Sequence, residues 1–230
     1  MTDVVLVAHG SPDARHAADV AALTTRIRGM HPSGRIATAY LECHGPSPAE
    51  AGEALGADGR LGSIVLVPTL LARAYHVGED IPEAANAVAR ATERDVRVSG
   101  ALGPHPLVAD ALVELVGTRR TDAVLIQIAG SSRQAAVDEL VDGLRAALPV
   151  GPAYGFTTLD EYLPFEKARS ALGDARWPLS VPCMIARGVL RDRMVTRAAD
   201  AGIPSVRGVL AGTDALARLV LARVAEATAA

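Results

Sequence analysis

The feature that most constrains the fold is an opening apolar run that stops abruptly at a histidine and a glycine. Residues 4–8 read Val-Val-Leu-Val-Ala, and three of the five are β-branched. Such a run suits a strand buried on both faces, as in a parallel sheet. After it, Gly10 permits a tight turn, Ser11 is a good helix N-cap, and Pro12 suits the first helical position. We therefore expect His9 at the carboxyl end of a strand, beside a helix N-terminus, where open α/β sheets bind ligands.

Strand-like and helix-like segments alternate through the first half of the chain. Strands are predicted over residues 4–8, 35–41, 63–67 and 96–99, and helices over 13–29, from Pro48 onward, over 80–93 and over 107–116. The sequence from Ser47 to Glu50 has the form of a capping box, which starts a helix. This alternation implies a parallel sheet with right-handed crossovers.

The second half of the chain repeats this plan. Residues 123–132 match the opening strand and turn, with Gly130 standing where Gly10 stands. Residues 181–187 parallel residues 67–73 in the same way. The sequence therefore predicts an α/β fold of two similar domains, each a parallel β-sheet flanked by helices, with a cleft between them.

The two copies differ in their polar residues. The position of His9 holds Ala129 in the second copy, that of His76 holds Leu190, and all six histidines lie in the first half. We therefore predict an N-terminal domain over residues 1–117 that carries the working site. The second domain, residues 122–230, is predicted to be a degenerate repeat that supplies walls and anion contacts.

Three polar side chains are expected at one edge of the first sheet. His9 and Glu42 end the first two predicted strands, and His76 lies in the loop after the third. Two imidazoles and a carboxylate suit a first-row divalent metal ion with open positions for a substrate, and Glu42 could also act as a general base. Two alternatives remain: the histidines only cap helices, or His44 and Glu79 replace some of these ligands.

Composition excludes several classes of partner. The 23 basic and 26 acidic residues give a net charge of −3, which does not favour nucleic-acid binding. No apolar run approaches the ~20 residues that a membrane span needs, and the N-terminus has no signal-peptide pattern. Cys43 and Cys183 form no CxxC motif, so we expect a reduced, cytoplasmic protein.

Several short motifs, in their order and spacing, carry a resemblance to a known family. They are His9-Gly10-Ser11, Tyr40-Leu41-Glu42 with Pro46-Ser47, Val67-Pro68 through His76-Val77 to Asp80-Ile81-Pro82, and Gly103-Pro104-His105-Pro106-Leu107. Together they resemble the sirohydrochlorin chelatases of the CbiX/SirB group, the class II chelatases, in their two-domain form with the active site in the N-terminal half. This resemblance spans the whole chain.

The resemblance implies a lyase that inserts Co²⁺ or Fe²⁺ into sirohydrochlorin, for cobalamin or siroheme biosynthesis. The metal ion is then a substrate, and no organic cofactor is expected. By position, His9 and His76 match the metal-binding histidines of the family, and Glu42 matches the acidic residue that assists them.

Sirohydrochlorin is a polycarboxylate, so its cleft needs hydrogen-bond donors. Arg73 and Arg187 occupy equivalent points of the repeat and are predicted to bind acid groups from both halves. The other predicted contacts lie at the starts of helices, namely Ser11, Arg15, Ser132 and Arg133. For each arginine the alternative is plain solvent exposure.

Two other functions stay open at this point. The chain could be a carrier that binds a tetrapyrrole or a metal ion without turnover, although a carrier needs no general base. It could also be a two-domain binder of small anions, against which the paired histidines count. The sequence predicts neither the physiological metal nor an oligomeric state.

Overall fold

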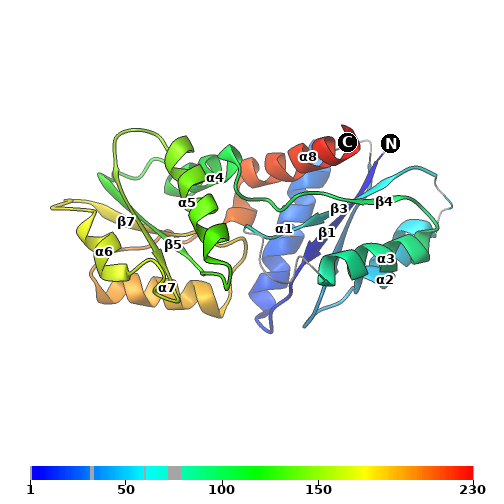
Figure 1. Ribbon diagram of the computed structural model, residues 1–230, viewed down its shortest axis with the longest axis horizontal. Helices are drawn as coiled ribbons and strands as arrows, with labels where there is room; N and C mark the ends of the chain where they lie inside the picture. The colour runs from blue at the N-terminus through cyan, green and yellow to red at the C-terminus, as the bar shows by residue number, and fades with distance from the viewer. Residues whose placement is uncertain (1, 32–33, 58, 60, 72–78, 230) are drawn as a thin grey trace.

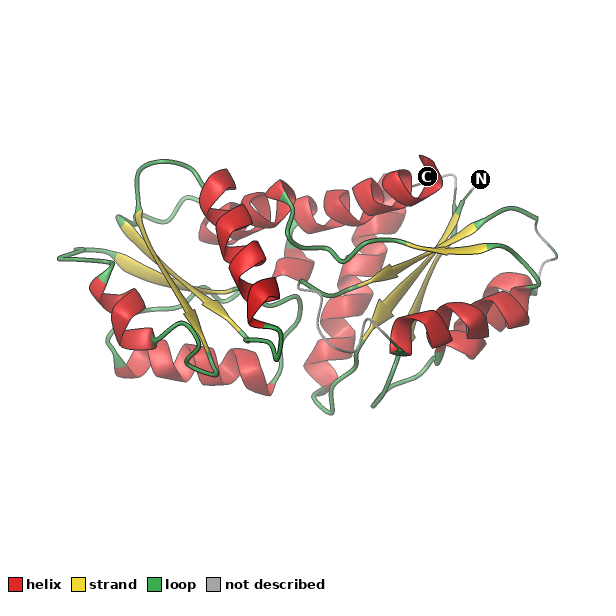
Figure 2. Cartoon of the chain, in the orientation of Figure 1, coloured by secondary structure: helices red, strands yellow, loops and turns green. Residues whose placement is uncertain are grey.

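The computed structural model describes residues 2–31, 34–57, 59, 61–71 and 79–229. Two parallel β-sheets stand side by side, and helices cover both (Figures 1 and 2). The predicted α/β class and the duplicated plan are confirmed. None of the described helices is long and apolar enough to cross a membrane.

The first sheet has the strand order β2-β1-β3-β4, and all its pairs are parallel. Its strands are β1 (Asp3–Ala8), β2 (Ile36–Tyr40), β3 (Ile64–Pro68) and β4 (Val96–Val98), and the helices between them are α1 (Ala14–Met30), α2 (Pro48–Gly56) and α3 (Asp80–Thr92). The first strand lies between two neighbours and is buried along its whole length. Its nearly continuous apolar sequence follows from that position.

The second sheet repeats this arrangement with the order β6-β5-β7. Its strands are β5 (Ala123–Ile128), β6 (Ala153–Thr158) and β7 (Pro178–Pro182), and the helices that follow them are α5 (Gln134–Ala147), α6 (Phe165–Ser170) and α7 (Val189–Asp200). One more helix follows each sheet in sequence. Helix α4 (Pro106–Val116) comes after the first sheet. Helix α8 (Asp214–Ala229), preceded by the 3₁₀ turn η2 (Leu210–Gly212), comes after the second.

The helices α4 and α8 are exchanged between the sheets. Although α4 follows the first sheet in sequence, it packs against α5 and β7 of the second half. In turn, α8 follows the second sheet but lies along α1 and β3 of the first half (Figure 1). Each sheet is therefore covered by a helix that follows the other sheet. The division of the chain into two domains, residues 1–117 and 122–230, remains a proposal drawn from the sequence.

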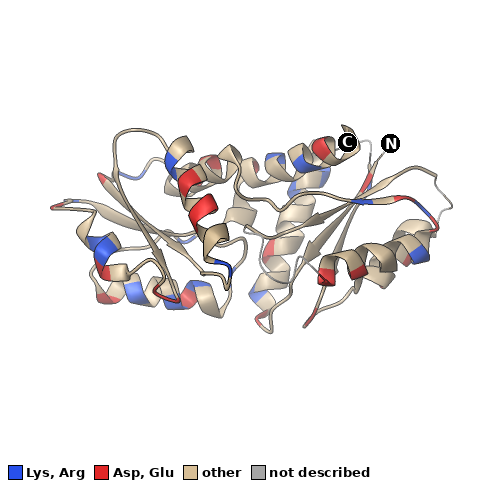
Figure 3. Cartoon of the chain, viewed as in Figure 1, with Lys and Arg blue, Asp and Glu red and all other residues tan. Residues whose placement is uncertain are grey.

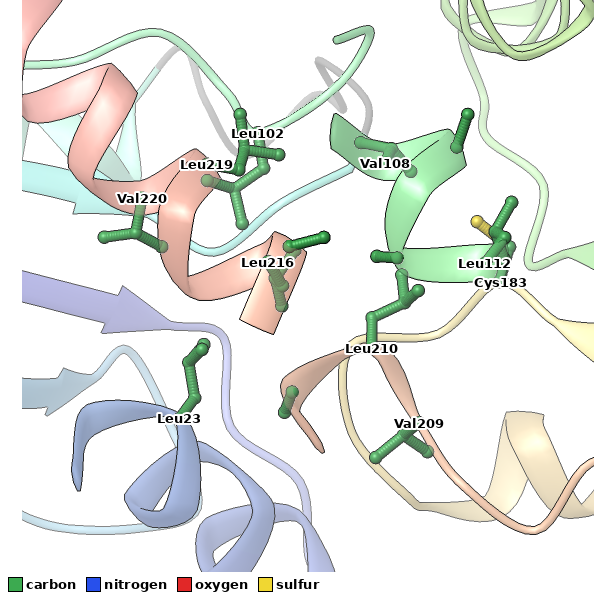
Figure 4. Close-up of a cluster of buried hydrophobic side chains, with 14 of the residues drawn as sticks. Leu23, Leu102, Val108, Leu112, Cys183, Val209, Leu210, Leu216, Leu219 and Val220 are labelled. Carbon is green, nitrogen blue, oxygen red and sulfur yellow. The ribbon is translucent and has the colours of Figure 1, made fainter. Parts of the chain in front are cut away.

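One apolar cluster joins the two halves because of this exchange. It contains Leu23 of α1, Leu112 of α4, Leu216 of α8 and Cys183, which directly follows β7 (Figure 4). Each of these side chains is at most 2% exposed. The core is thus continuous across the boundary between the sheets.

The helix starts test the predicted caps. The capping box of α2 is confirmed: Ser47 Oγ accepts from the amide of Glu50, and Glu50 Oε2 accepts from the amide of Ser47. The predicted N-cap of α1 was wrong. Ser11 Oγ accepts only the amide of Asp13, at 3.2 Å, and Asp13 caps the helix by accepting the amide of Arg15 at 2.9 Å. The turn out of β1 uses the residues up to Pro12, so the helix begins two residues later.

Candidate metal-binding site

The edge of the first sheet brings His9 and Glu42 together. Ala8 of β1 lies opposite Tyr40 of β2, and the ladder continues one step further, where the amide of Glu42 donates to the carbonyl of His9 at 2.9 Å. Their side chains meet with 3.4 Å between His9 Nδ1 and Glu42 Oε1. These side chains are 42% and 59% exposed, so an incoming ion can reach them.

Gly10 makes this close approach possible. Its φ of +103° lies in the region that favours glycine, and a Cβ there would collide with the carbonyl group of Glu42. Only a glycine lets the chain turn out of β1 while Glu42 stays against it.

A cavity of about 600 Å³ opens beside this pair. Its lining comes from the ends of β1 and β2 and the starts of α2 and α3: His9, Leu41, Glu42, Ser47, Pro48, Ala49, Asp80, Glu83, Ala84 and Ala87. All these residues belong to the first half, whereas the sequence predicted a site in a cleft between the halves. Ion pairs hold the two halves together on the opposite face of the first sheet, the face that α1 covers.

Two acidic residues that line this cavity were not predicted as site residues from the sequence. Asp80 and Glu83 occupy the first turn of α3 (Figure 3). Acidic residues are common in the first turn of any helix, where they favour the macrodipole. That ordinary reason does not reveal that both residues also line the cavity beside His9 and Glu42.

Two predicted site residues, His76 and Arg73, lie outside the described residues. Among the residues that are described, no three His, Cys, Asp or Glu side chains are arranged to hold a metal ion. The described part of the predicted ligand set is therefore the pair of His9 and Glu42. Of the alternative ligands, Glu79 is exposed at the N-cap of α3.

Two further histidines, His16 and His44, pack near the ring of Tyr40 on the α1 face of the sheet. Its ring centroid lies 5.4 Å from that of His44 and 6.4 Å from that of His16. His16 of α1 is half-buried, because it packs toward Tyr40 at the end of β2. Burial and the neighbouring His44 and His9 lower the pKa of His16, which keeps this imidazole neutral at neutral pH.

Two predicted arginines meet carboxylates at the seam between the halves. Arg187 of the second half forms a fork with the buried Asp19 of α1, with 2.7 Å between Nη2 and Oδ1. Arg15 of the first half pairs with Asp13 beside it and, at 2.6 Å, with Asp192 of α7. Neither arginine is simply exposed: each helps to join the halves.

The second half keeps the backbone of the site without its imidazole. Ile128 lies opposite Thr158 as Ala8 lies opposite Tyr40, so Ala129 and Asp160 occupy the positions of His9 and Glu42. Gly130 has a φ of +97°, and a Cβ on it would collide with the carboxylate of Asp160. The turn and a carboxylate are therefore retained.

The serine that matches Ser11 is Ser131, one residue before the predicted Ser132. Its Oγ accepts the amide of Arg133 at 3.2 Å, as Ser11 accepts that of Asp13. Ser132 and Arg133 are exposed, and Arg133 is the N-cap of α5 rather than part of its first turn. Their contacts with a substrate remain predictions.

Comparisons with known proteins agree on one family and one fold. The family model CbiX matches residues 3–119. SirB from Bacillus subtilis, solved with Fe³⁺, has 22% identity and a TM-score of 0.77, over 99% of this chain and 96% of that chain. The sirohydrochlorin chelatase SirB from Bacillus subtilis subspecies spizizenii, in complex with cobalt, has 19% identity and a TM-score of 0.75, over 98% and 94% of the two chains.

A third similar structure is larger than this chain. It is a multi-domain protein from Deinococcus radiodurans, described as structurally similar to chelatases, with 20% identity and a TM-score of 0.73 over 99% of this chain and 55% of that one. No curated protein matches the sequence. At these identities the solved structures establish a shared fold over the whole chain.

Proposed function

This chain belongs to the CbiX family, and from that membership we propose that it is a sirohydrochlorin chelatase, a lyase that inserts Co²⁺ or Fe²⁺ into the macrocycle. The observation that carries the proposal is the pairing of His9 with Glu42 at the open edge of the first sheet, 3.4 Å apart and beside a cavity. Solved relatives of the same fold that hold iron and cobalt support the choice of metal ions.

In this proposal the imidazoles of His9 and His76 hold the incoming ion from one side. Neutral imidazole is a good ligand for Co²⁺ and Fe²⁺, and a small ligand set leaves positions for the ring nitrogens of the macrocycle. His9 directly follows the buried central strand β1, and its carbonyl accepts the amide of Glu42. The main chain that carries the ligand is thus held in place before the metal arrives.

Glu42 has two roles in the proposal. Insertion releases the inner N–H protons of the macrocycle, and a carboxylate within reach can accept them and pass them to water. The carboxylate also faces Nδ1 of His9, so it can fix which ring nitrogen of His9 is free for the metal. Its exposure of 59% gives the accepted proton a path to solvent.

In this proposal Arg187 binds a carboxylate of the macrocycle. The further predicted contacts are Arg73, Arg15, Arg133, Ser11 and Ser132. Guanidinium groups match carboxylates well because both are planar and can pair through two hydrogen bonds. Cys43 and Cys183 are both free thiols, which fits a reducing compartment such as the cytoplasm.

An absorbance assay of the purified protein with sirohydrochlorin and either Co²⁺ or Fe²⁺ tests the proposal. The expected result is metal insertion well above the rate without protein, with many turnovers per chain. A single stoichiometric spectral change without turnover would favour the carrier function instead. Absence of any change with both metals would overturn the proposal.

A further inference from the structure

Asp19 is a buried carboxylate devoted to one arginine of the other half. It lies in α1 and is 8% exposed, yet it accepts the backbone amide of Arg187 at 2.8 Å and the Nε and Nη2 groups of the same residue at 2.9 and 2.7 Å. Main chain and side chain of Arg187 are therefore both fixed by a single residue across the seam.

This pairing leaves one edge of the guanidinium available. The group carries five N–H donors, and Asp19 takes the edge formed by Nε and Nη2. Within the part of the chain that the structure describes, Nη1 of Arg187 has no acceptor, and the side chain is 40% exposed. The outer edge, Nη1 with the second hydrogen of Nη2, can thus receive another carboxylate through two hydrogen bonds.

Arg15 provides an internal comparison. It also presents its Nε and Nη2 groups to a neighbouring carboxylate, that of Asp13, but its Nη2 bonds Asp192 as well. Its outer edge is therefore already engaged by the protein. Of these two seam arginines, Arg187 is the one whose outer edge is open.

The position of Arg187 relates it to the metal-binding site. Ala186 packs with Ala8 and Tyr40, the residues one place before His9 and two places before Glu42. On the other side of Arg187, a Cβ on Gly188 would lie 3.6 Å from Ser11 Oγ. Arg187 is thus held beside the turn that carries His9, on the α1 side of the sheet, so a macrocycle lying over the strand ends would have to reach from the cavity to this side.

We propose that Asp19 is a positioning residue, which holds Arg187 so that its outer edge binds a carboxylate of the macrocycle. This inference rests on the proposed function. Asp19 does not touch the substrate: its side chain is 11% exposed and covered by the arginine that it holds. An arginine fixed before binding loses less conformational entropy when the carboxylate arrives, so the contact contributes more to affinity.

The test compares the steady-state kinetics of Asp19→Asn with those of the wild type, with sirohydrochlorin as the varied substrate. We expect KM to rise about 10-fold, the usual effect of losing a charge-assisted hydrogen bond. We also expect kcat to stay within about twofold, as when binding is lost equally from ground and transition states. Asp214→Asn is the matched control, since it removes a carboxylate that pairs with Arg26 across the seam. It should leave KM unchanged.

Two further variants separate positioning from a merely structural tie. Arg187→Lys keeps a cation beside Asp19 but lacks the fork, so KM should rise as in Asp19→Asn while the melting temperature stays near that of the wild type. In the double variant Asp19→Asn/Arg187→Lys, KM should rise little further than in either single variant, because both changes remove the same contact.

The outcomes distinguish this inference from the proposed function. A wild type without turnover overturns the proposed function, and Kd values for metal-free sirohydrochlorin, from its absorbance, then replace KM in the comparison. An unchanged KM, or Kd, in Arg187→Lys overturns the role of Arg187. An unchanged value in a folded Asp19→Asn protein, or a fall in kcat alone, overturns the positioning role.

Discussion

The amide of Glu42 donates to the carbonyl of His9 at 2.9 Å, so these two residues are joined through their main chains as well as through their side chains. The ladder between β1 and β2 therefore holds the pair in place, and the side chains are not needed to maintain it. Variants of either side chain should keep the fold, which makes them clean probes of chemistry.

The first prediction concerns the histidine ligands. His9→Ala and His76→Ala should abolish metal insertion, because each removes a proposed ligand, and the unfolding curve of His9→Ala should match that of the wild type. Calorimetric titration with Co²⁺ measures the loss of binding directly. The control is His105→Ala: Nδ1 of His105 caps α4 through the amide of Leu107, so this variant should lose about 1 kcal/mol of stability but keep its turnover.

The second prediction separates two roles of Glu42. Glu42→Gln keeps the size of the side chain but cannot accept a proton, so insertion should fall by roughly 10²–10⁴-fold, the range for general acid–base catalysis. If Glu42 acts mainly as the base, Co²⁺ affinity measured by titration should fall much less than the rate. Collapse of both quantities would instead make Glu42 a primary ligand, and survival of both would remove it from the site.

The third prediction concerns the turn after β1. Gly10→Ala places a methyl group against the carbonyl of Glu42 at a φ of +103°, so it should both destabilise the protein and reduce metal insertion. Gly29→Ala is the matched control, because nothing lies within 4 Å of its new Cβ. Gly29 lies in the last turn of α1, so this change should stabilise by at most the roughly 0.5–1 kcal/mol expected in the middle of a helix. Equal effects of the two substitutions on turnover would contradict the prediction.

The fourth prediction concerns Asp3 and pH. Burial alone would raise the pKa of Asp3, but hydrogen bonds from Arg35 and Arg94 outweigh it and lower the pKa from 3.8 to about 2. The carboxylate therefore stabilises the folded protein above about pH 4, and this contribution disappears as the pH falls toward 2. Asp3→Asn should cost about 3–5 kcal/mol at pH 7, since it leaves buried Arg94 without its carboxylate.

Urea unfolding at several pH values measures this difference. The gap between wild type and Asp3→Asn should narrow from pH 4 to pH 2. A gap that is independent of pH would show that altered hydrogen bonding by the amide, rather than the lost charge, is responsible.

The fifth prediction follows from the shared core. Leu216 of α8 is fully buried among residues of both halves, so Leu216→Ala should reduce the free energy of unfolding by about 2–5 kcal/mol. The protein should still unfold in a single transition, with a lower midpoint. Leu61→Ala, at a site that is 92% exposed, should change stability by less than about 0.5 kcal/mol. Two separate transitions, of which only one shifts, would contradict this view of the core.

The local features of the fold were readable from the sequence because they depend on neighbouring residues. The apolar run of β1, the capping box at Ser47 and the meeting of His9 with Glu42 all follow from patterns of a few residues and from the geometry of parallel strands. The N-cap of α1 was misplaced since Ser11 and Asp13 are both good caps, and the length of the turn decides between them.

The pairing of helices with sheets could not be read in this way. Periodicity shows which face of α4 or α8 is buried, but either sheet offers an equally apolar partner. Asp19 was overlooked for a similar reason: a polar residue on α1 is expected in solvent, and the arginine that buries it lies far away in sequence. Contacts between distant segments are a property of the assembled halves.

The exchange of α4 and α8 also bears on how the chain folds as it is made. Every strand of the first sheet leaves the ribosome long before residues 214–229, and at 5–20 residues per second the sheet waits several seconds for its covering helix. During that interval the face of β3 that α8 will cover is open to chaperones and to other nascent chains. We therefore expect translation that stops before α8 to yield an aggregation-prone fragment, even though every strand of the first sheet is present.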